Sequence, residues 1–289
     1  MTTAPALDIV VVSYNARQHL VACLDSLHRA PPRRAHTIVV VDNASTDGSA
    51  ETVAGRWPGV RLIGNRDNVG FARGNNLGIR ATSGDLVLLL NSDTLVAAGA
   101  LDRLVAALEQ APEAAVAGPR LVDAHGVPEL SFGRMIGPWN EARQRLITGA
   151  HARGIGLARR YVARQASRRQ WPDWVSGACL LVWRRDAERV GLLDERYFMY
   201  AEDVDFCAAV RAAGRRVLFT PDAEIVHLRG RSRAASPEAT RVAYRRSQLA
   251  FYAKHHPAWV PALRAYLRVK GALPPGGPDD PVCYPWAGR

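Results

Sequence analysis

Cysteine and long apolar runs are both scarce in this sequence. Its 289 residues include four cysteines that lie far apart and form no C-x-x-C pair, Cys23, Cys179, Cys207 and Cys283. Reduced thiols in a cytoplasmic protein are the simplest interpretation. No apolar run approaches the roughly 18–20 residues of a membrane span. The first predicted strand begins at residue 7, and we expect no signal peptide before it.

The motifs of several common enzyme classes are also absent. No G-x-x-x-x-G-K-[ST] occurs, which excludes a P-loop enzyme. The dinucleotide fingerprint G-x-G-x-x-G is missing after the first strand, and Gly154-Ile155-Gly156 follows no predicted strand. No G-x-S-x-G elbow is present for a serine nucleophile. Hydride transfer by the Rossmann route and serine hydrolysis are therefore both disfavoured.

What the sequence does have is a net charge of +11 that is concentrated in two segments. Residues 134–169 carry nine arginines against one acid, Glu141, and residues 229–270 carry ten basic residues against Glu238. The rest of the chain is mildly acidic. This pattern predicts anionic partners, such as nucleotide phosphates, acidic lipid head groups or nucleic acid.

Strand and helix signals alternate through the first 110 residues. We expect strands at 7–12, 36–41, 60–63 and 86–90, separated by helices at 16–30, 47–57, 71–82 and 98–110. This βαβαβ order predicts a parallel sheet with right-handed crossovers. From about 121 the pattern is less regular, with a strand at 174–183, a helix at 203–213, an extended segment at 217–226 and helices at 238–255 and 258–269.

Polar clusters follow the predicted strands at the points where they end. The clustered residues are Ser13 and Asn15, Asp42, Asn68, Gly70 and Asn75, and Asn91, Ser92 and Asp93. Any one cluster is also explained by helix capping, since Ser, Asp and Asn are preferred N-caps and Asp93-Thr94 could cap a following helix. In a parallel sheet, however, the carboxyl ends of the strands share one edge, where open α/β folds bind ligands. Four such clusters predict a nucleotide-binding crevice.

The second half of the sequence supplies candidate catalytic groups. Glu202, Asp203 and Asp205 lie beside aromatic residues at a predicted helix start. Helix capping explains them too, but an apolar environment would raise the pKa of a carboxyl group and suit it to proton abstraction. His227 ends the extended segment, and a lone histidine on a strand is more often structural than a ligand.

Together these segments resemble the inverting family 2 glycosyltransferases of GT-A fold, and most closely the bacterial rhamnosyltransferase branch. The resemblance runs in order from about residue 8 to 256. It is carried by Val-Val-Ser-Tyr-Asn (11–15), Val-Asp-Asn-Ala-Ser-Thr-Asp-Gly-Ser (41–49), Asn-Val-Gly-Phe-Ala-Arg-Gly-Asn-Asn (68–76), Leu-Leu-Leu-Asn-Ser-Asp-Thr (88–94), Ser-Gly-Ala-Cys-Leu-Leu-Val (176–182), Tyr-Ala-Glu-Asp-Val-Asp (200–205) and His-Leu-Arg-Gly-Arg-Ser (227–232).

The resemblance implies an α/β fold with a Rossmann-like mixed sheet flanked by helices and a C-terminal helical extension. Residues 1–120 would form the nucleotide-sugar-binding half of one domain, and 121–232 its catalytic and acceptor half. Residues 233–270 would form the C-terminal helices, and 271–289 a tail rich in Pro and Gly.

The resemblance also implies a role for each clustered residue. Asp42 would accept the N3–H of uracil or thymine, and Asp203 would be the general base. Asp93 and His227 would ligate Mg²⁺ or Mn²⁺, which accept carboxylate oxygen and imidazole nitrogen. Asp205 would hold sugar hydroxyls or shape the base. The remaining nucleotide-sugar contacts would be Ser13, Asn15, Asn68, Gly70, Asn75, Asn91, Ser92, Glu202 and Arg231, with Arg245-Arg246-Ser247 also placed to close over the diphosphate.

One position departs from the family pattern. Members often have Asp-x-Asp where this sequence has Asn91-Ser92-Asp93. Asn91 is neutral, so it can reach the ribose while it ligates metal poorly. A site with fewer charged ligands is expected to hold its metal more weakly.

The expected donor is dTDP-L-rhamnose, and the expected acceptor is a cell-envelope glycan or a polyprenyl-diphosphate-linked sugar. Residues 139–170 interleave arginines with apolar side chains, which fits either an anionic membrane surface or a solvated helix or loop. We therefore expect a cytoplasmic enzyme, free or peripheral at the inner face of the membrane. The sequence assigns no oligomeric state.

Three other functions remain open from the sequence. The first is transfer of glucose, galactose or N-acetylglucosamine from a UDP-sugar by the same chemistry. The second is a noncatalytic nucleotide-sugar binder. The third is a nucleic-acid-binding protein that uses the basic segments, which we disfavour because it leaves the strand-end clusters and Asp203 unexplained.

Overall fold

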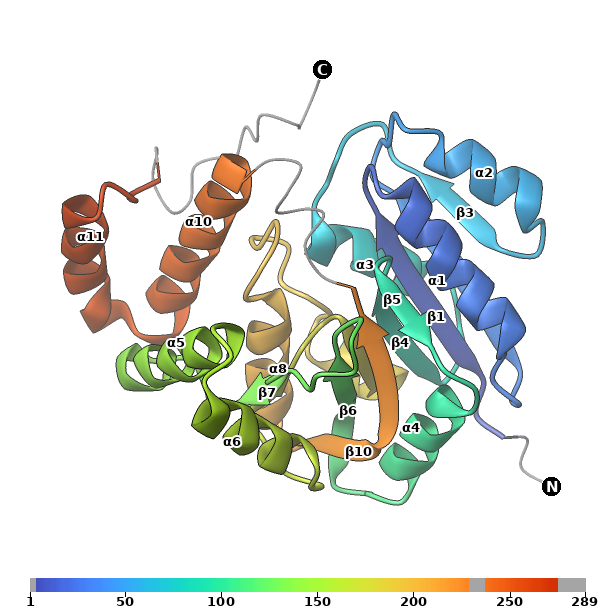
Figure 1. Cartoon of the computed structure of the whole chain (residues 1–289). Helices are drawn as coiled ribbons and strands as arrows, with labels where there is room; N and C mark the ends of the chain where they lie inside the picture. Colours follow the sequence, from blue (N-terminus) through green and yellow to red (C-terminus); the bar gives the residue numbers. More distant parts are fainter. Residues whose placement is uncertain (1–3, 229–236, 275–289) are drawn as a thin grey trace.

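The computed structural model describes residues 4–228 and 237–274, and an eight-stranded mixed sheet lies at its centre (Figure 1). The strand order is β3-β2-β1-β4-β9-β6-β10-β5. The strands are β1 (Leu7–Ser13), β2 (His36–Asp42), β3 (Arg61–Gly64), β4 (Leu86–Asn91), β5 (Thr94–Val96), β6 (Ala114–Val122), β9 (Cys179–Trp183) and β10 (Arg216–His227). A separate pair is formed by β7 (Phe132–Gly133) and β8 (Trp174–Val175).

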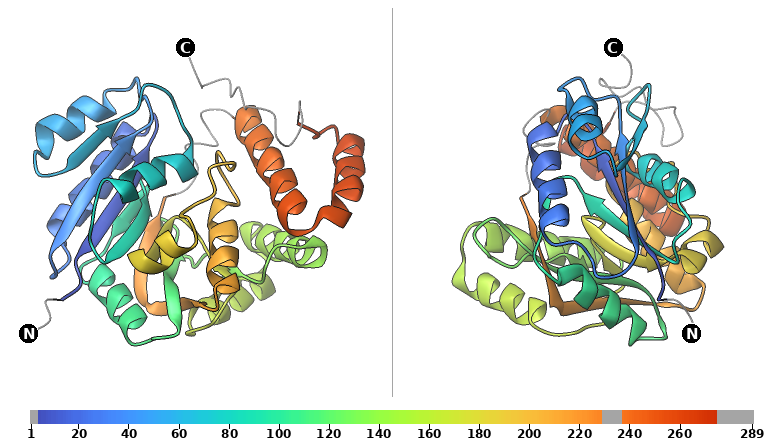
Figure 2. Two further views of the ribbon diagram at one scale, coloured as in Figure 1. Left: turned by 180° about the vertical axis from the view of Figure 1, so that it is seen from behind. Right: turned by 90° about the vertical axis from the view of Figure 1, so that its right-hand side faces the viewer.

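The predicted parallel βαβαβ unit is confirmed. Strands β1 and β2, β2 and β3, and β1 and β4 all pair in parallel, whereas β9 pairs antiparallel to both β4 and β6. Helices on both faces bury the sheet, as Figures 1 and 2 show. One face packs against α1 (Arg17–Arg29), α2 (Ser49–Arg56) and α4 (Ala100–Glu109). The other packs against α3 (Phe71–Arg80), α7 (Arg184–Arg189) and α8 (Glu202–Ala212).

Two glycines let α3 lie directly on the sheet. A Cβ atom at Gly74 would lie 2.9 Å from Cγ1 of Val12, and one at Gly78 would overlap Cγ1 of Val10. The four-residue spacing puts both glycines on one face of the helix. The close approach holds the start of α3 beside the carboxyl ends of β1 and β2.

The chain after Asp93 differs from one sequence interpretation. Asp93 and Thr94 were one candidate helix cap, but Thr94 begins β5, and the next helix, α4, begins only at Ala100. Strand β5 pairs antiparallel with β10 and places Thr94 opposite His227. The capping explanation for Asp93 is therefore wrong.

Other differences follow from short or irregular elements. The strand expected at 174–183 is interrupted between β8 and β9, and β6 was not predicted although it lies in the sheet. The basic stretch 139–170 forms two helices, α5 (Pro138–Ala152) and α6 (Gly156–Ala166). Helix α5 buries none of its residues, so its sequence lacks the apolar periodicity that would have predicted it.

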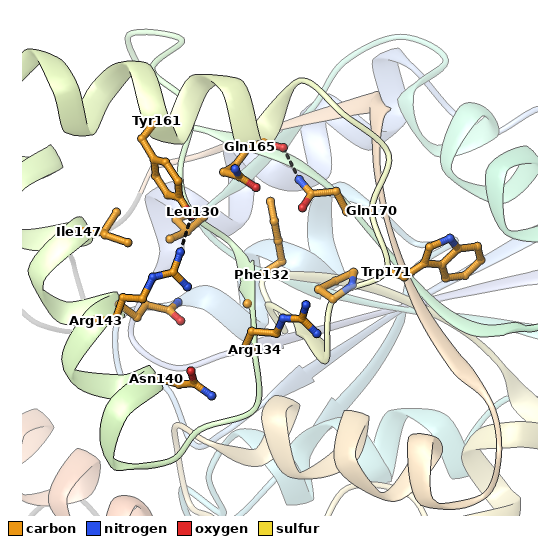
Figure 3. A pocket seen from close by; sticks show the side chains of 13 residues that line it. Leu130, Phe132, Arg134, Asn140, Arg143, Ile147, Tyr161, Gln165, Gln170 and Trp171 are labelled. Atoms are coloured by element: carbon orange, nitrogen blue, oxygen red, sulfur yellow. Dashed lines mark hydrogen bonds between the residues drawn. The ribbon is translucent and has the colours of Figure 1, made fainter.

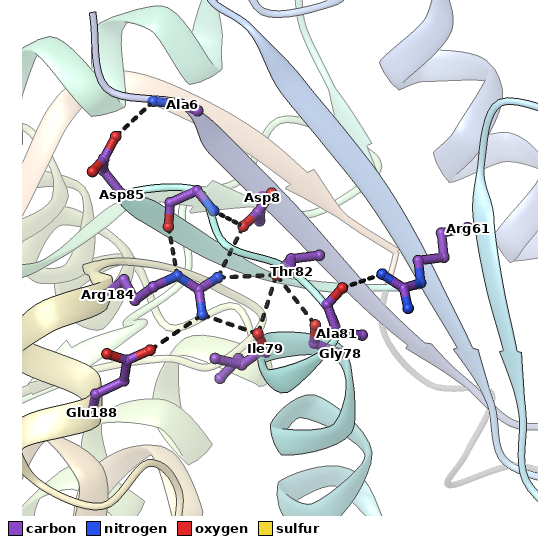
Figure 4. A network of polar contacts seen from close by, with 11 residues as sticks. Ala6, Asp8, Arg61, Gly78, Ile79, Ala81, Thr82, Asp85, Arg184 and Glu188 are labelled. Carbon is purple, nitrogen blue, oxygen red and sulfur yellow. Dashed lines mark hydrogen bonds and ion pairs between the residues drawn. The ribbon is translucent and has the colours of Figure 1, made fainter.

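A buried ion pair joins the two halves of the chain at the end of the sheet where β1 begins (Figure 4). Nη2 of Arg184 lies 2.9 Å from Oδ2 of Asp8, and the same guanidinium donates to the carbonyl groups of Gly84 and Ile79. The backbone N–H of Gly84 also donates to Asp8. Because the charges are paired and hydrogen-bonded, their burial is tolerated.

The predicted C-terminal helices are confirmed as α10 (Pro237–His255) and α11 (Val260–Val269), with a 3₁₀ turn, η1 (Pro257–Trp259), between them. Phe251 and Tyr252 of α10 pack with Tyr197 and Val204 in a small cluster of their own. Within residues 4–228 and 237–274, no helix combines the length and apolar character needed to cross a membrane.

Candidate active site

The carboxyl ends of β1, β2 and β4 bring three predicted contacts into register. Ser13 pairs with Asp42, and Val12, the residue before Ser13, pairs with Asn91. Ser13 and Asp42 are almost fully buried. Oγ of Ser13, Oδ1 of Asp42 and Oδ1 of Asn91 are buried without a hydrogen-bond partner in the described part of the chain. Buried polar atoms normally have partners, so these three oxygens are suited to donors of a bound ligand.

The loop after β2 is held by Asn15. Asn15 has a positive φ of 47°, and its Oδ1 accepts the N–H of Thr46 at 2.8 Å. Oδ2 of Asp42 accepts the N–H of Ser45 at 2.9 Å, while its other oxygen stays open. The side chain of Asn15 therefore shapes the loop, and Asp42 carries the open acceptor.

The loop before α3 is held by a hydrogen bond between the side chain of Asn68 and the backbone of Gly70. Oδ1 of Asn68 accepts the N–H of Gly70 at 3.0 Å, and Gly70 has a φ of 84°, which favours glycine. A Cβ atom there would also overlap Phe198. In the second turn of α3, Asn75 is fully buried and its Oδ1 has no partner among the described residues. Asn68 and Gly70 thus set the loop, and Asn75 offers a further acceptor.

Asp93 and His227 meet at the other side of the same edge. Oδ1 of Asp93 lies 3.3 Å from Nε2 of His227, and Nδ1 of His227 lies 3.4 Å from Oε2 of Glu129. Burial alone would raise the pKa of Asp93, but the hydrogen bond and charge of His227 outweigh it and lower that pKa. Burial likewise lowers the pKa of His227, but the two carboxylates raise it to about 9.

This pair fits a divalent cation by its donor atoms and spacing. Two neighbouring ligands of an octahedral Mg²⁺ or Mn²⁺ lie about 3 Å apart when each is about 2.1 Å from the metal. The oxygen and nitrogen of Asp93 and His227 meet that spacing. Within the described residues, no group of three or more His, Cys, Asp or Glu side chains is arranged to hold a metal. Asp93 and His227 are thus two candidate ligands, and Glu129 contacts the other ring nitrogen of His227.

The carboxyl group of Asp203 lies at the start of α8. It is half-buried, and it accepts the backbone N–H groups of Gly177 and Val204, each at 2.8 Å. Burial raises the pKa of Asp203 in spite of these hydrogen bonds. Glu202 is buried, its Oε2 has no partner in the residues described, and burial together with the charge of Asp203 raises its pKa well above the usual value.

A strained turn presents these two acids. Tyr200 and Ala201 have positive φ angles of 73° and 67°, which are uncommon for residues other than glycine. Such strain gathers at functional sites because the surrounding structure maintains it. The hydroxyl of Ser247 donates to the carbonyl of Met199 at 2.7 Å and helps to hold the turn.

Backbone contacts connect the acid to the strand ends. The N–H of Gly177 binds Asp203, and the N–H of Asn91 donates to the carbonyl of Ala178 at 2.9 Å. A Cβ atom at Gly177 would lie 3.2 Å from that of Asp203 and 3.4 Å from Phe71 of α3. The catalytic candidate, the end of β4 and the start of α3 therefore border one space.

Both carboxylate oxygens of Asp205 are hydrogen-bonded within the protein. Its Oδ2 lies 2.8 Å from Nζ of Lys254, and its Oδ1 lies 2.6 Å from Nε2 of His255 and accepts the hydroxyl of Tyr197 at 3.2 Å. The resemblance implied that Asp205 holds sugar hydroxyls or shapes the base. In the structure both carboxylate oxygens of Asp205 contact other side chains of the protein, and two of these contacts join α8 to α10.

The remaining predictions have mixed outcomes. Arg231 and Ser232 lie outside the described residues. Nη1 of Arg245 donates to Gln248 at 2.8 Å, and the hydroxyl of Ser247 holds the turn described above; their contact with the diphosphate stays a prediction. Ser92 is half-buried beside Asp93. Glu129 was not predicted, because it follows a tight turn after β6 and belongs to no polar cluster in the sequence.

A separate cavity of about 360 Å³ lies between α5, α6 and β7 (Figure 3). Arg143, which donates to the hydroxyl of Tyr161 at 2.8 Å, and Gln165 line it together with Phe132 and Trp171. None of its lining residues is a predicted site residue. We place the active site at the strand ends, because the open polar atoms gather there.

Known protein sequences resemble this chain over most of its length. The sequence profile of glycosyl transferase family 2 matches residues 8–156. An N-acetylglucosaminyl-diphospho-decaprenol L-rhamnosyltransferase of Mycobacterium tuberculosis is 31% identical over 306 aligned positions, which cover 92% of this chain and 94% of the relative.

Solved structures with the same fold have low sequence identity. A mannosyltransferase of Pyrobaculum calidifontis in complex with GDP-Man and Mn²⁺ matches with a TM-score of 0.59 at 20% identity, over 94% of this chain and 74% of the other. GalNAc-T7 with UDP, GalNAc and Mn²⁺ matches with a TM-score of 0.63 at 18% identity, over 92% and 52%. These likenesses bear on the fold alone.

Proposed function

Since the chain belongs to glycosyl transferase family 2 and has the GT-A fold, we propose that it transfers L-rhamnose from dTDP-L-rhamnose to a lipid-linked sugar, with inversion and with a divalent metal. The observation that carries this proposal is the 31% identity to a rhamnosyltransferase over 92% of the chain. The relative's name also gives the acceptor class, a sugar diphosphate on a polyprenol.

The open acceptors at the strand ends support nucleotide binding. Oδ1 of Asp42 has no partner in the described chain and would accept the N3–H of thymine. Cytosine and adenine carry no proton at that position. Ser13 and Asn91 would bind the ribose beside it. These three residues would orient the donor by its nucleoside end.

Asp93 and His227 would hold the metal beside the diphosphate of the donor. Mg²⁺ is commonly bound by one or two protein groups plus substrate phosphates. A metal so placed would neutralise charge on the departing diphosphate. Glu129, which contacts Nδ1 of His227, would fix the orientation of the ring so that Nε2 faces the site.

Asp203 would remove the proton from the acceptor hydroxyl. As the oxygen forms its bond to the anomeric carbon, the bond from that carbon to the diphosphate oxygen breaks on the opposite face. The proton goes to Asp203, and the electron pair leaves with dTDP. A single displacement inverts the anomeric configuration. The backbone N–H groups of Gly177 and Val204 would keep the carboxylate in place.

Transfer assays with matched donors test the proposal. Purified protein with Mn²⁺ and a polyprenyl-diphosphate N-acetylglucosamine acceptor is given dTDP-L-rhamnose, UDP-glucose, UDP-galactose or UDP-N-acetylglucosamine. We expect product from dTDP-L-rhamnose alone, with inverted configuration by NMR. Product from a UDP-sugar instead would reject rhamnose as the sugar, and retained configuration would reject the single displacement.

A further inference from the structure

The exposed large apolar side chains gather on one part of the molecule. Among the described residues they occur only in α5, α6, the turn between them, η1 and α11. They are Trp139, Leu146, Ile155, Leu157, Trp259, Tyr266 and Val269. Trp139 is 81% exposed, Leu157 79% and Val269 88%. Such side chains scattered singly are ordinary, but their concentration marks an interaction surface.

These elements lie side by side. Nε2 of His256, next to η1, lies 2.7 Å from the carbonyl oxygen of Ile136, just before α5. Figures 1 and 2 show α5, α6, α10 and α11 together at one side of the molecule, away from α1 and α2. We name the seven apolar side chains and the arginines of residues 138–170 the apolar–basic surface.

The charge of this surface has one sign. Helices α5 and α6 with their flanking residues, 138–170, contain eight arginines and a single acid, Glu141. That acid faces inward, where its carboxylate accepts from Arg145, Gln248 and Tyr252. Arg160 and Arg164 are exposed on α6, three and seven residues after Leu157, and therefore share its side of the helix. Nothing negative on α5 or α6 faces solvent.

We propose that the apolar–basic surface docks on an anionic lipid bilayer. Exposed Trp and Leu side chains would enter the boundary between head groups and acyl chains, while the arginines meet acidic lipid head groups. The inference extends the proposed function, since a polyprenol-linked acceptor is held in a membrane. Helix α10 carries η1 and α11 and is joined to α8 through Asp205, so the surface is connected to the element that bears Asp203.

Vesicle flotation tests the proposal. The full chain is floated with vesicles of phosphatidylglycerol and phosphatidylcholine, and with phosphatidylcholine alone. We expect binding to the anionic vesicles that weakens with added NaCl. Arg160→Glu with Arg164→Glu should weaken binding about 30-fold or more, because each basic side chain near an anionic surface strengthens it about fivefold. Leu146→Ser with Leu157→Ser should weaken it about 100-fold or more.

Matched controls separate this surface from general charge and from the donor site. Arg33→Glu removes an arginine whose side chain is 94% exposed elsewhere, and it should leave binding unchanged. All variants should bind dTDP with Mn²⁺ as the wild type does, which also shows that they are folded. Vesicle binding without any dTDP binding would support the surface and contradict only the proposed function.

Three results would overturn the inference. The first is a wild-type protein that does not bind anionic vesicles. The second is equal loss of binding in Arg33→Glu and in the α6 charge variant. The third is wild-type protein that binds single-stranded RNA, or that dimerises through Leu146 and Leu157, while it ignores vesicles.

Discussion

At the scale of single residues, the site consists of groups that the protein leaves unsatisfied. Buried acceptors without a partner among the described residues occur on Ser13, Asp42, Asn75, Asn91 and Glu202. Each unsatisfied buried group costs about 1–3 kcal/mol. A ligand that supplies donors recovers this free energy, so the same atoms that weaken the empty protein strengthen binding.

Asp203→Asn tests the general base. The amide keeps the shape of the side chain but cannot take a proton, so we expect kcat to fall by roughly 10²–10⁴-fold. Calorimetric binding of dTDP with Mn²⁺ should be unchanged, because the assigned role of Asp203 is toward the acceptor hydroxyl and not toward the nucleotide. Equal activity of variant and wild type would show that another group removes the proton.

The pH profile gives a second test of Asp203. Burial raises its pKa, and only the ionised carboxylate accepts a proton. The rate should therefore fall as pH falls through that raised pKa, above the ordinary value of about 3.9. Two backbone N–H groups favour the ionised form of Asp203, whereas Oε2 of Glu202 has no partner in the described chain, so Asp203 ionises first.

Glu202→Gln serves as the control for this profile. If Glu202 is still neutral when Asp203 ionises, the variant should show the same fall of log(kcat/KM) at low pH as the wild type, with the same apparent pKa. An acid limb near the ordinary aspartate value, or one that moves in Glu202→Gln, would contradict this assignment.

Glu129→Gln tests the support of His227. Loss of the carboxylate frees the imidazole ring, so Mn²⁺ in the presence of dTDP should bind about 10–100-fold more weakly. Titration followed by electron paramagnetic resonance measures this without catalysis. Glu224→Gln, on β10 and paired with Arg120 at 3.3 Å, is the matched control. Equal metal affinity in the two variants would remove Glu129 from the site.

At the scale of elements, α8 and α10 are held together by a small polar group. Lys254 contacts both Asp194 and Asp205 at 2.8 Å, and Asp205 is buried. The pKa of Lys254 is raised: burial lowers it, but the hydrogen bonds and charges of the two acids outweigh that effect. The contact fixes α10 relative to the helix that bears Asp203.

Lys254→Met tests this contact against the only other lysine. We expect the free energy of unfolding to fall by about 1–3 kcal/mol, because Asp205 loses one of its partners in a buried position. Lys270→Met, at an exposed position, should change it little. Urea unfolding followed by circular dichroism measures both. Equal effects of the two substitutions would show that the contact contributes nothing to stability.

At the scale of the whole molecule, the sequence predicted the elements whose pattern is local. The parallel strands before residue 91 are continuous apolar runs, and turn residues separate them from helices. Strand β6 was not predicted, because it depends on pairing with distant segments, and β5 has only three residues; the strand predicted at 174–183 includes β9 but missed the break after β8. Helix α5 lies on the surface and buries nothing, so no periodicity marks it.

The site residues at the strand ends were also predictable from the sequence, whereas contacts between distant residues were not. Ser13, Asp42, Asn91 and Asp93 follow strands, and the topology alone brings them together. The inward contacts of Asp205 and the support of His227 by Glu129 were not predictable, because each joins residues far apart in the chain. Asn15 shows why residue type alone does not separate ligand contacts from structural contacts. An asparagine at a strand end suits a ligand contact, but in the structure its side-chain oxygen accepts from the loop after β2.

The central claim is that the strand-end crevice binds a thymidine diphosphate through a metal. Calorimetric titration with dTDP, UDP, GDP and ADP, each with Mn²⁺ and then with EDTA, tests it most directly. We predict that dTDP binds more tightly than the other three and that EDTA weakens this binding strongly. Equal affinity for all four nucleotides, or binding that EDTA leaves unchanged, would contradict the account.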